Sequence, residues 1–200
     1  LLLNEANKLA EQLTALRKKS AEAFAKNVVS HIHDLAMQQA EFFVEVKPIE
    51  KLSDTGLDEI NFLFSADAGQ VARPLNKVAS RGELSRIALA IKTVLLGRVG
   101  LPTMVFDEVD TGVGGATAQR MAEKLATIAL KKQVLCITHL PQIACMADCH
   151  IRIEKKQDKS TTWIDVQMLN EKERVDEITR MVAGDDTTKL AKDNAQQMIE

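Results

Sequence analysis

The chain has 200 residues, of which 46% are apolar and 27% charged, and its formal net charge is -2 at pH 7. This length and composition predict an ordinary soluble globular protein with one sizeable domain. Lys and Arg are mixed with Asp and Glu along the chain, so the composition does not indicate a surface that binds nucleic acid. No apolar run approaches the ~20 residues of a membrane span, and no signal peptide is visible.

The cysteines and histidines give weak signals. Three cysteines, an odd number, fit a reducing interior better than a disulfide framework. The spacing of Cys145, Cys149 and His150 invites a zinc site, but no second ligand pair follows, so packing thiols are the preferred interpretation. His31 and His33 do not share a helix face and are interpreted as solvated helix residues. The chain begins without a methionine, which suggests a fragment of a longer protein.

Residues 1–40 contain neither Gly nor Pro and predict a long helix. A spacing of four and three residues, typical of a coiled-coil seam, links Leu2, Ala6, Leu9, Leu13, Leu16, Ser20, Ala23 and Asn27. The seam decays into Ser and Asn, which indicates the end of a coiled-coil arm (1–40) entering a globular head (41–200). An amphipathic helix lying on its own domain stays open as the alternative, because three heptads are near the minimum for this pattern.

Short strands and helices follow. Two strands are expected at 42–47, ending at Pro48, and at 59–65. From residue 80 the pattern predicts helices at 82–96, 117–130, 174–183 and 188–199, and strands at 103–106, 133–137, 149–154 and 161–169. Apolar strands that alternate with helices favour an α/β fold with a largely parallel sheet covered on both faces.

Charged residues lie where two of these strands end. The strand 103–106 runs into Asp107 and Glu108, which is the Walker B pattern of phosphate-binding ATPases. There the first acid holds Mg²⁺, usually through water, and the second can deprotonate an attacking water. An acidic turn after a strand is the simpler interpretation of this motif alone. The next strand leads to His139, which can donate to a phosphate, although a structural histidine is commoner at such a position.

Ser80 and Glu83 have the S-x-x-E spacing of a capping box at the start of a helix. A cap is a sufficient explanation of this pair. The same hydroxyl, the Gly82 N–H and the helix N-terminus would also form an anion site for phosphate.

Four stretches together resemble the carboxyl-terminal part of the RecN family, bacterial DNA repair proteins related to the structural-maintenance-of-chromosomes proteins. The stretches are "GLDEINFLFSADAG", "PLNKVASRGELSRIALAIK", "PTMVFDEVDTGVGG" and "QVLCITHLPQIACMADCH". Their order is that of the ABC-type ATPases: signature motif, Walker B, aspartate loop, switch histidine. The resemblance implies part of an ABC-type P-loop NTPase head, with a mostly parallel sheet flanked by helices and preceded by a coiled-coil helix.

The resemblance also implies roles for the acids and the histidine. Asp107 would be the magnesium acid, bound through water, and Glu108 the catalytic base. Asp110 would be the loop aspartate that faces a partner head, and His139 the switch histidine.

At the signature helix, the resemblance makes Ser80, Arg81, Gly82 and Glu83 contacts for the γ-phosphate of ATP held by a second head. Two departures stand out. The sequence contains no G-x-x-x-x-G-K-[ST] loop, which the family carries across the coiled coil. Arg81 also stands where the family has a glycine.

The implied function is that of an ATP- and Mg²⁺-dependent head in recombinational repair of DNA double-strand breaks. Its expected partners are a second head, either another copy or the amino-terminal half, and DNA, with no membrane. The expected location is the cytoplasm, in association with the nucleoid. Another ABC-type ATPase, such as a transporter subunit, and a non-catalytic pairing module are the alternatives.

Overall fold

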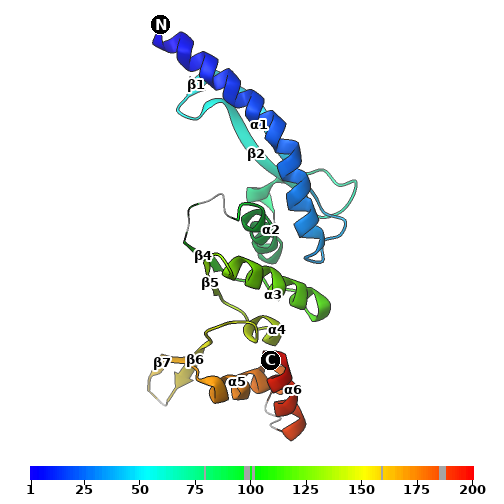
Figure 1. Ribbon diagram of the computed structural model, residues 1–200, viewed down its shortest axis with the longest axis vertical. Coiled ribbons are helices and arrows are strands. Elements are labelled where there is room, and N and C mark those ends of the chain that lie inside the picture. Colours follow the sequence, from blue (N-terminus) through cyan, green and yellow to red (C-terminus); the bar gives the residue numbers. More distant parts are fainter. Residues whose placement is uncertain (79, 97–99, 101, 159, 185–187) are drawn as a thin grey trace. The chain divides into compact units, whose positions relative to one another are not determined.

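The computed structural model describes residues 1–78, 80–96, 100, 102–158, 160–184 and 188–200 (Figure 1). They form two compact units, the first made of Leu1–Pro102 with Phe106–Thr111 and the second of Thr103–Val105 with Gly112–Glu200. The elements in chain order are α1 (Leu2–His33), β1 (Glu41–Ser53), β2 (Gly56–Ser65), β3 (Arg73–Pro74), η1 (Leu75–Lys77), α2 (Arg81–Val94), β4 (Thr103–Phe106), α3 (Gly115–Ala129), β5 (Gln133–Cys136), α4 (Pro141–Ala144), β6 (Ile151–Gln157), β7 (Thr162–Met168), α5 (Glu171–Ala183) and α6 (Lys189–Ile199).

In the first unit, α1 lies on an antiparallel sheet with the strand order β1-β2-β3. The ring of Phe24 on α1 contacts those of Phe42 and Phe62, at centroid distances of 6.4 and 6.0 Å. The α1 residues that make the main contacts or are buried are Ala10, Thr14, Arg17, Phe24, Val28 and Ile32. Most of these contact residues lie one position after a residue of the predicted seam. The stripe of α1 that packs on the sheet is therefore next to the seam and does not coincide with it.

The predicted coiled-coil seam is exposed in this chain. Leu2, Leu9 and Leu16 have exposed fractions of 83%, 59% and 62%. One face of α1 packs on its own sheet, as the alternative of an amphipathic helix predicts. The other face carries the exposed seam, and pairing of a coiled-coil arm through it stays a prediction.

The strand β1 continues past Pro48, where the sequence predicted its end. Pro48 lies opposite Asp58, and the register shifts between Pro48 and Ser53. In the described part of the chain β1 is an edge strand, so the missing N–H of proline removes no ladder hydrogen bond on its outer side.

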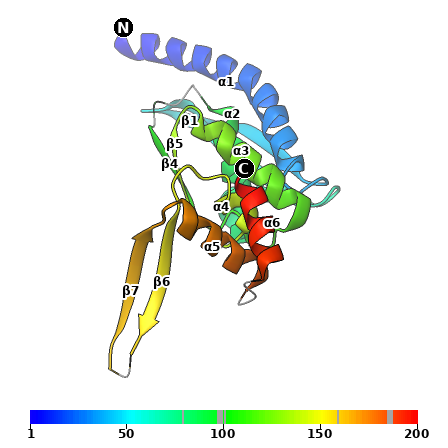
Figure 2. The same ribbon diagram turned by 60° about the horizontal axis from the view of Figure 1, so that its bottom comes forward.

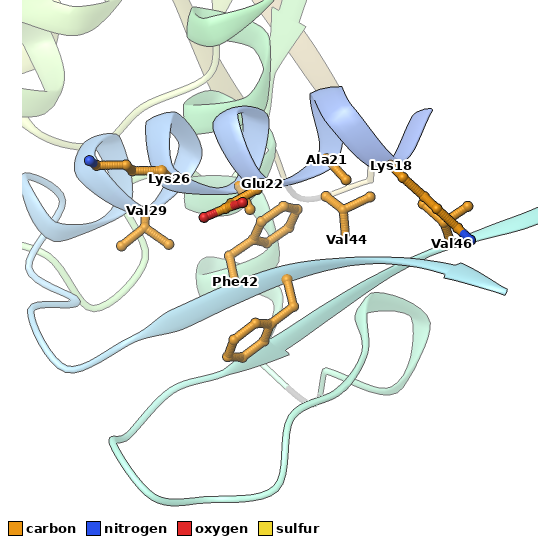
Figure 3. Close-up of a pocket in the computed structure, with 10 residues that line it drawn as sticks. Lys18, Ala21, Glu22, Lys26, Val29, Phe42, Val44 and Val46 are labelled. Carbon is orange, nitrogen blue, oxygen red and sulfur yellow. The ribbon is translucent and has the colours of Figure 1, made fainter. Parts of the chain in front are cut away.

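A groove of about 540 Å³ lies between α1 and β1 (Figure 3). Val29 of α1 and the side chains of Phe42 and Val44 on β1 form apolar walls, while Lys18 and Lys26 lie beside them on the helix. The groove results from the helix crossing a strand whose outer edge has no neighbour among the described residues.

The second unit contains a parallel pair, β4 and β5, and a separate antiparallel hairpin, β6 and β7. The strands predicted at 149–154 and 161–169 form this hairpin, a pairing that the sequence did not predict. The segment between them is short, and parallel strands need a crossover of a dozen or more residues. Figure 2 shows the hairpin extending from the start of α5.

The helices α4, α5 and α6 form a small core of their own. Ala144, Cys145, Ile178 and Ala195 are buried in it. Burial raises the pKa of the Cys145 thiol, which supports its interpretation as a packing thiol. Cys149, by contrast, is exposed.

His33 differs from its interpretation from the sequence. His33 is half-buried, and its Nε2 lies 2.9 Å from the carbonyl oxygen of Ala40, so its interpretation as a solvated residue is wrong.

Of the helices in the described residues, none combines the length and the hydropathy needed to cross a bilayer.

Candidate active site

The start of α2 shows one of the two hydrogen bonds of the predicted capping box, the one that Ser80 accepts. Ser80 is the N-cap in an extended conformation, and its Oγ accepts a hydrogen bond of 3.3 Å from the N–H of Glu83. Ser80 is exposed, whereas Gly82 in the first turn is buried. The first N–H groups of a helix have no partner within the helix, which suits them to bind an anion. The positive end of the helix dipole adds to the preference for an anion here.

Gly82 is buried in the first turn of α2 against the loop that follows β4. A Cβ at this position would lie 2.9 Å from the carbonyl oxygen of Thr111 and 3.2 Å from its Cβ. The glycine is therefore required by the close packing of α2 on this loop.

Two side chains of α2 fasten the acid loop, which we define as Asp107 to Thr111. The hydroxyl of Ser85 donates to the carbonyl oxygen of Asp107 at 3.0 Å, and Nη1 of Arg86 donates to that of Thr111 at 2.9 Å. Burial lowers the pKa of the Arg86 guanidinium, and Glu83 partly offsets this effect. Both ends of the acid loop are thus fixed to the helix that begins at Ser80.

The three acids of the loop have different surroundings. Asp107 is exposed, Glu108 is half-buried, and Asp110 has an exposed fraction of 2%. Glu108 has φ = 55°, a left-handed conformation that is uncommon for a residue with a Cβ. The loop also turns sharply, since the N–H of Thr111 donates to the carbonyl oxygen of Glu108 at 3.3 Å.

Arg81 lies next to the predicted catalytic base. Its Nη1 is 3.6 Å from Oε1 of Glu108, and the side chains are 85% and 44% exposed. Arg81 and Glu108 both belong to the first unit, so this contact is internal to it.

The residues present fit magnesium and a phosphate only in part. Asp107 offers an exposed carboxylate, which is the ligand type that a hydrated Mg²⁺ prefers. Among the described residues, no three His, Cys, Asp or Glu side chains gather closely enough to hold a metal ion. Phosphate oxygens and waters would therefore supply most ligands of a magnesium ion bound at Asp107.

His139 is placed differently from the other predicted site residues. It is exposed and follows β5 in the second unit. Because β4 and β5 run parallel, they end at the same edge of their sheet, as expected from the sequence. The role of His139 itself stays a prediction.

Sequence reasoning missed Ser85, Arg86 and Thr111, which set the position of the acid loop. A signal was available in "ELSRIALAI", where Ser and Arg interrupt an otherwise apolar helix. Such polar residues on a packed helix need hydrogen-bond partners, and here the partners are loop carbonyls.

The chain is similar to proteins described as DNA repair protein RecN. It is 40% identical to that of Halalkalibacterium halodurans over 192 residues, which is 94% of this chain and 34% of the relative. It is 41% identical to that of Haemophilus influenzae, over 96% of this chain and 34% of the relative. The chain thus spans about a third of the length of the curated relatives that it matches, and no family model matches it.

Two solved structures show the fold. The Smc head domain with a coiled coil and joint from Pyrococcus yayanosii has a TM-score of 0.59 at 19% identity, covering 86% of this chain and 31% of that one. The Smc head domain with an extended coiled coil from Pyrococcus furiosus, solved with the C-terminal domain of ScpA, has a TM-score of 0.56 at 18% identity, covering 89% and 43%. The predicted α/β head fold is confirmed. Over about a third of their length, the proteins described as DNA repair protein RecN are similar to nearly the whole of this chain, which confirms the resemblance seen in the sequence.

Proposed function

We propose that this segment is the part of a RecN-type head that supplies the magnesium acid, the catalytic base and the signature helix for ATP hydrolysis. The observation that carries the proposal is the attachment of the acid loop to α2 by Ser85 and Arg86. It joins the two elements that ATP-dependent chemistry requires, an anion-binding helix start and a pair of acids, within one compact unit.

The chemistry proposed for this chain uses few groups. Mg²⁺, when bound, would neutralise charge on the phosphates. Asp107 would hold it through water, and Glu108 would orient an attacking water and accept its proton. Ser80, Gly82 and the first turn of α2 would contact the γ-phosphate held by a second head. His139 would donate to the same phosphate, and Asp110 would face the partner.

In the whole protein, the proposal is that two heads sandwich ATP and open after hydrolysis. This cycle would couple the nucleotide state to DNA-bound assemblies during recombinational repair, in the cytoplasm and in association with the nucleoid. Support comes from the relatives' description as DNA repair proteins. A transporter subunit is disfavoured, because relatives that match this chain at about 40% identity are described as DNA repair proteins.

Two substitutions in a complete RecN-family protein that carries this segment test the proposal. Glu108→Gln removes the acceptor for the water proton, so we expect ATP binding to persist, turnover to fall by about 10²–10⁴-fold and closed head pairs to accumulate. Asp107→Asn should instead weaken binding of Mg²⁺–ATP. Nucleotide binding, turnover and sedimentation with ATP measure these effects.

Asp148→Asn is the matched control, because Asp148 is an exposed acid that lies outside the acid loop. It should retain the turnover and the pairing of the parent protein. Full activity in both Glu108→Gln and Asp107→Asn would show that the two acids merely end a strand.

A non-catalytic pairing module is the second candidate, and the exposed seam of Leu2, Leu9 and Leu16 favours it. Such a module would pair through this seam regardless of nucleotide. Sedimentation of a complete RecN-family protein that carries this segment, with and without Mg²⁺–ATP, separates the two candidates, because only the first predicts that pairing depends on ATP.

A further inference from the structure

The contact between Arg81 and Glu108 joins the residue that departs from the family pattern to the proposed catalytic base. Nη1 of Arg81 lies 3.6 Å from Oε1 of Glu108. Arg81 is the first residue of α2, and Glu108 is the second of the acid loop. The two residues are distant in sequence, so only the packing of α2 on the loop brings them together.

That packing fixes the distance between the two residues. Ser85 and Arg86 bind the two ends of the acid loop, and Gly82 allows close approach of α2 to Thr111. Glu108 itself is held in a left-handed conformation, which limits the directions that its side chain can take. The packing of α2 on the acid loop fixes the two backbones relative to one another. The conformations of the Arg81 and Glu108 side chains then decide whether the guanidinium contacts the carboxylate.

We propose that Arg81 restrains Glu108 within its own head, so that this protein hydrolyses ATP more slowly than it would with a neutral residue at position 81. The inference rests on the proposed role of Glu108 as the base. At 3.6 Å the contact is an ion pair and not a hydrogen bond, so the guanidinium acts through its charge. It attracts the carboxylate toward the start of α2 and makes the carboxylate a weaker acceptor for the proton of the attacking water.

The size of the effect follows from the exposure of the pair. Exposed ion pairs contribute little, and their attraction is screened by salt. Only one carboxylate oxygen is engaged at 3.6 Å, so the restraint attenuates the base and does not abolish it. We expect a change in turnover of about two- to fivefold, largest at low ionic strength.

Substitutions at Arg81 separate charge from bulk. Arg81→Met keeps a long side chain but removes the charge and the donors, Arg81→Lys keeps the charge, and Arg81→Gly removes both. In a complete RecN-family protein carrying this segment, we expect Arg81→Met and Arg81→Gly to raise kcat by about two- to fivefold at low salt, and Arg81→Lys to stay near the parent. The gain should shrink as salt rises.

The control is Arg120→Met, which removes an exposed arginine from α3 and should leave kcat unchanged. A higher kcat in Arg81→Gly alone would mean that bulk matters and that the ion pair does not. A lower kcat in both neutral variants would identify Arg81 as a phosphate ligand. Either result overturns the restraint.

The failure of this inference can be told from the failure of the proposed function. Glu108→Gln in the parent and in Arg81→Met should give the same low turnover, because the restraint acts only through the carboxylate. If Glu108→Gln remains fully active, the proposed function itself is wrong. If Glu108→Gln is inactive while Arg81→Met has the turnover of the parent, the proposed function is supported and the restraint by Arg81 is wrong.

Discussion

At the scale of single residues, the acid loop shows why the chain follows a buried strand with acid and then with glycine. Glu108 adopts φ = 55°, and after the acids Gly112 and Gly115 adopt φ = 71° and 54°. Repeated left-handed positions turn the chain sharply within a few residues, and only glycine takes them without cost. The Glu108 carboxylate lies near the start of α2, with its Oε1 3.6 Å from Nη1 of Arg81.

Gly82→Ala should destabilise the first unit by about 1–3 kcal/mol, because the new Cβ would lie 2.9 Å from a backbone oxygen that cannot move alone. The denaturant midpoint of unfolding measures the loss. Gly100→Ala is the control, since a Cβ there has no atom within 4 Å. If the Gly82 and Gly100 variants have equal stability, α2 does not pack on Thr111 as described.

Replacing Glu108 by Gly and by Ala separates the function of the side chain from the strain of the backbone. Both variants should lose turnover in the complete protein, because both lack the carboxylate. Glu108→Gly should be more stable than Glu108→Ala by about 0.5–1 kcal/mol, since glycine relieves the left-handed conformation at some cost in unfolded-state entropy. Equal free energies of unfolding would show that position 108 is not strained.

At the scale of secondary-structure elements, α1 carries two stripes of residues that are offset by one position. One contains Leu9 and Leu16, which are exposed, and the other contains Ala10 and Arg17, which lie against the sheet. Both stripes repeat at three and four residues, so helical periodicity alone cannot decide which one packs inside the unit.

A local sequence pattern identifies an element but not the element that packs against it, and this limit applies to the rest of the fold and to the site. Strand 103–106 was predicted correctly, because an apolar run marks it locally, while the roles of the acids after it stay a prediction. The β6–β7 pairing was not predicted, because alternation reveals a strand but not its neighbour. Likewise Ser80 was predicted as a cap, whereas the bonds from Ser85 and Arg86 depend on which loop lies beside α2.

Arg17→Ala should loosen α1 from β2. The carboxylate of Asp58 is buried, accepts from Thr14 at 2.8 and 2.9 Å, and lies 3.1 Å from Nη1 of Arg17. Removing Arg17 leaves a buried carboxylate without its cation, which we expect to cost about 2–3 kcal/mol of unfolding free energy. Lys19→Ala, an exposed change on the same helix, should cost almost nothing. A stable Arg17→Ala protein would show that Thr14 alone satisfies Asp58.

The β6–β7 hairpin has one apolar face that is exposed in this chain. The cross-strand register places on it Ile151, Ile153, Ile164, Val166 and Met168. A contiguous apolar face of this kind promotes association. We expect the 200-residue chain to associate with rising concentration, and Ile164→Thr with Val166→Thr to reduce this while keeping strand-forming residues. Sedimentation velocity measures the change.

Val71→Thr is the control for the hairpin, because Val71 is a single exposed apolar residue in a loop of the first unit. It should leave association unchanged. Association that persists in the hairpin variant would point to another surface, such as the leucine seam of α1.

At the scale of the whole molecule, we propose that the chain carries one part of an ATPase site. Asp107, Glu108 and the start of α2 lie in one unit, and His139 in the other. The chain spans about a third of its relatives' length, and its sequence holds no G-x-x-x-x-G-K-[ST] loop. In ATPases of this class that loop supplies backbone N–H groups and a lysine for the β- and γ-phosphates.

The 200-residue chain should therefore show no appreciable ATP hydrolysis by itself. Glu108 can accept a proton only from a water placed opposite a bound γ-phosphate, and the contacts from Ser80 and the α2 N-terminus are too few to hold a triphosphate in that position. A turnover assay on the purified chain with Mg²⁺ tests this, with Glu108→Ala as the control for contaminating enzymes. Hydrolysis that requires Mg²⁺ and disappears in Glu108→Ala would contradict the prediction. It would mean that the acid loop and the start of α2 bind ATP productively without a phosphate-binding loop.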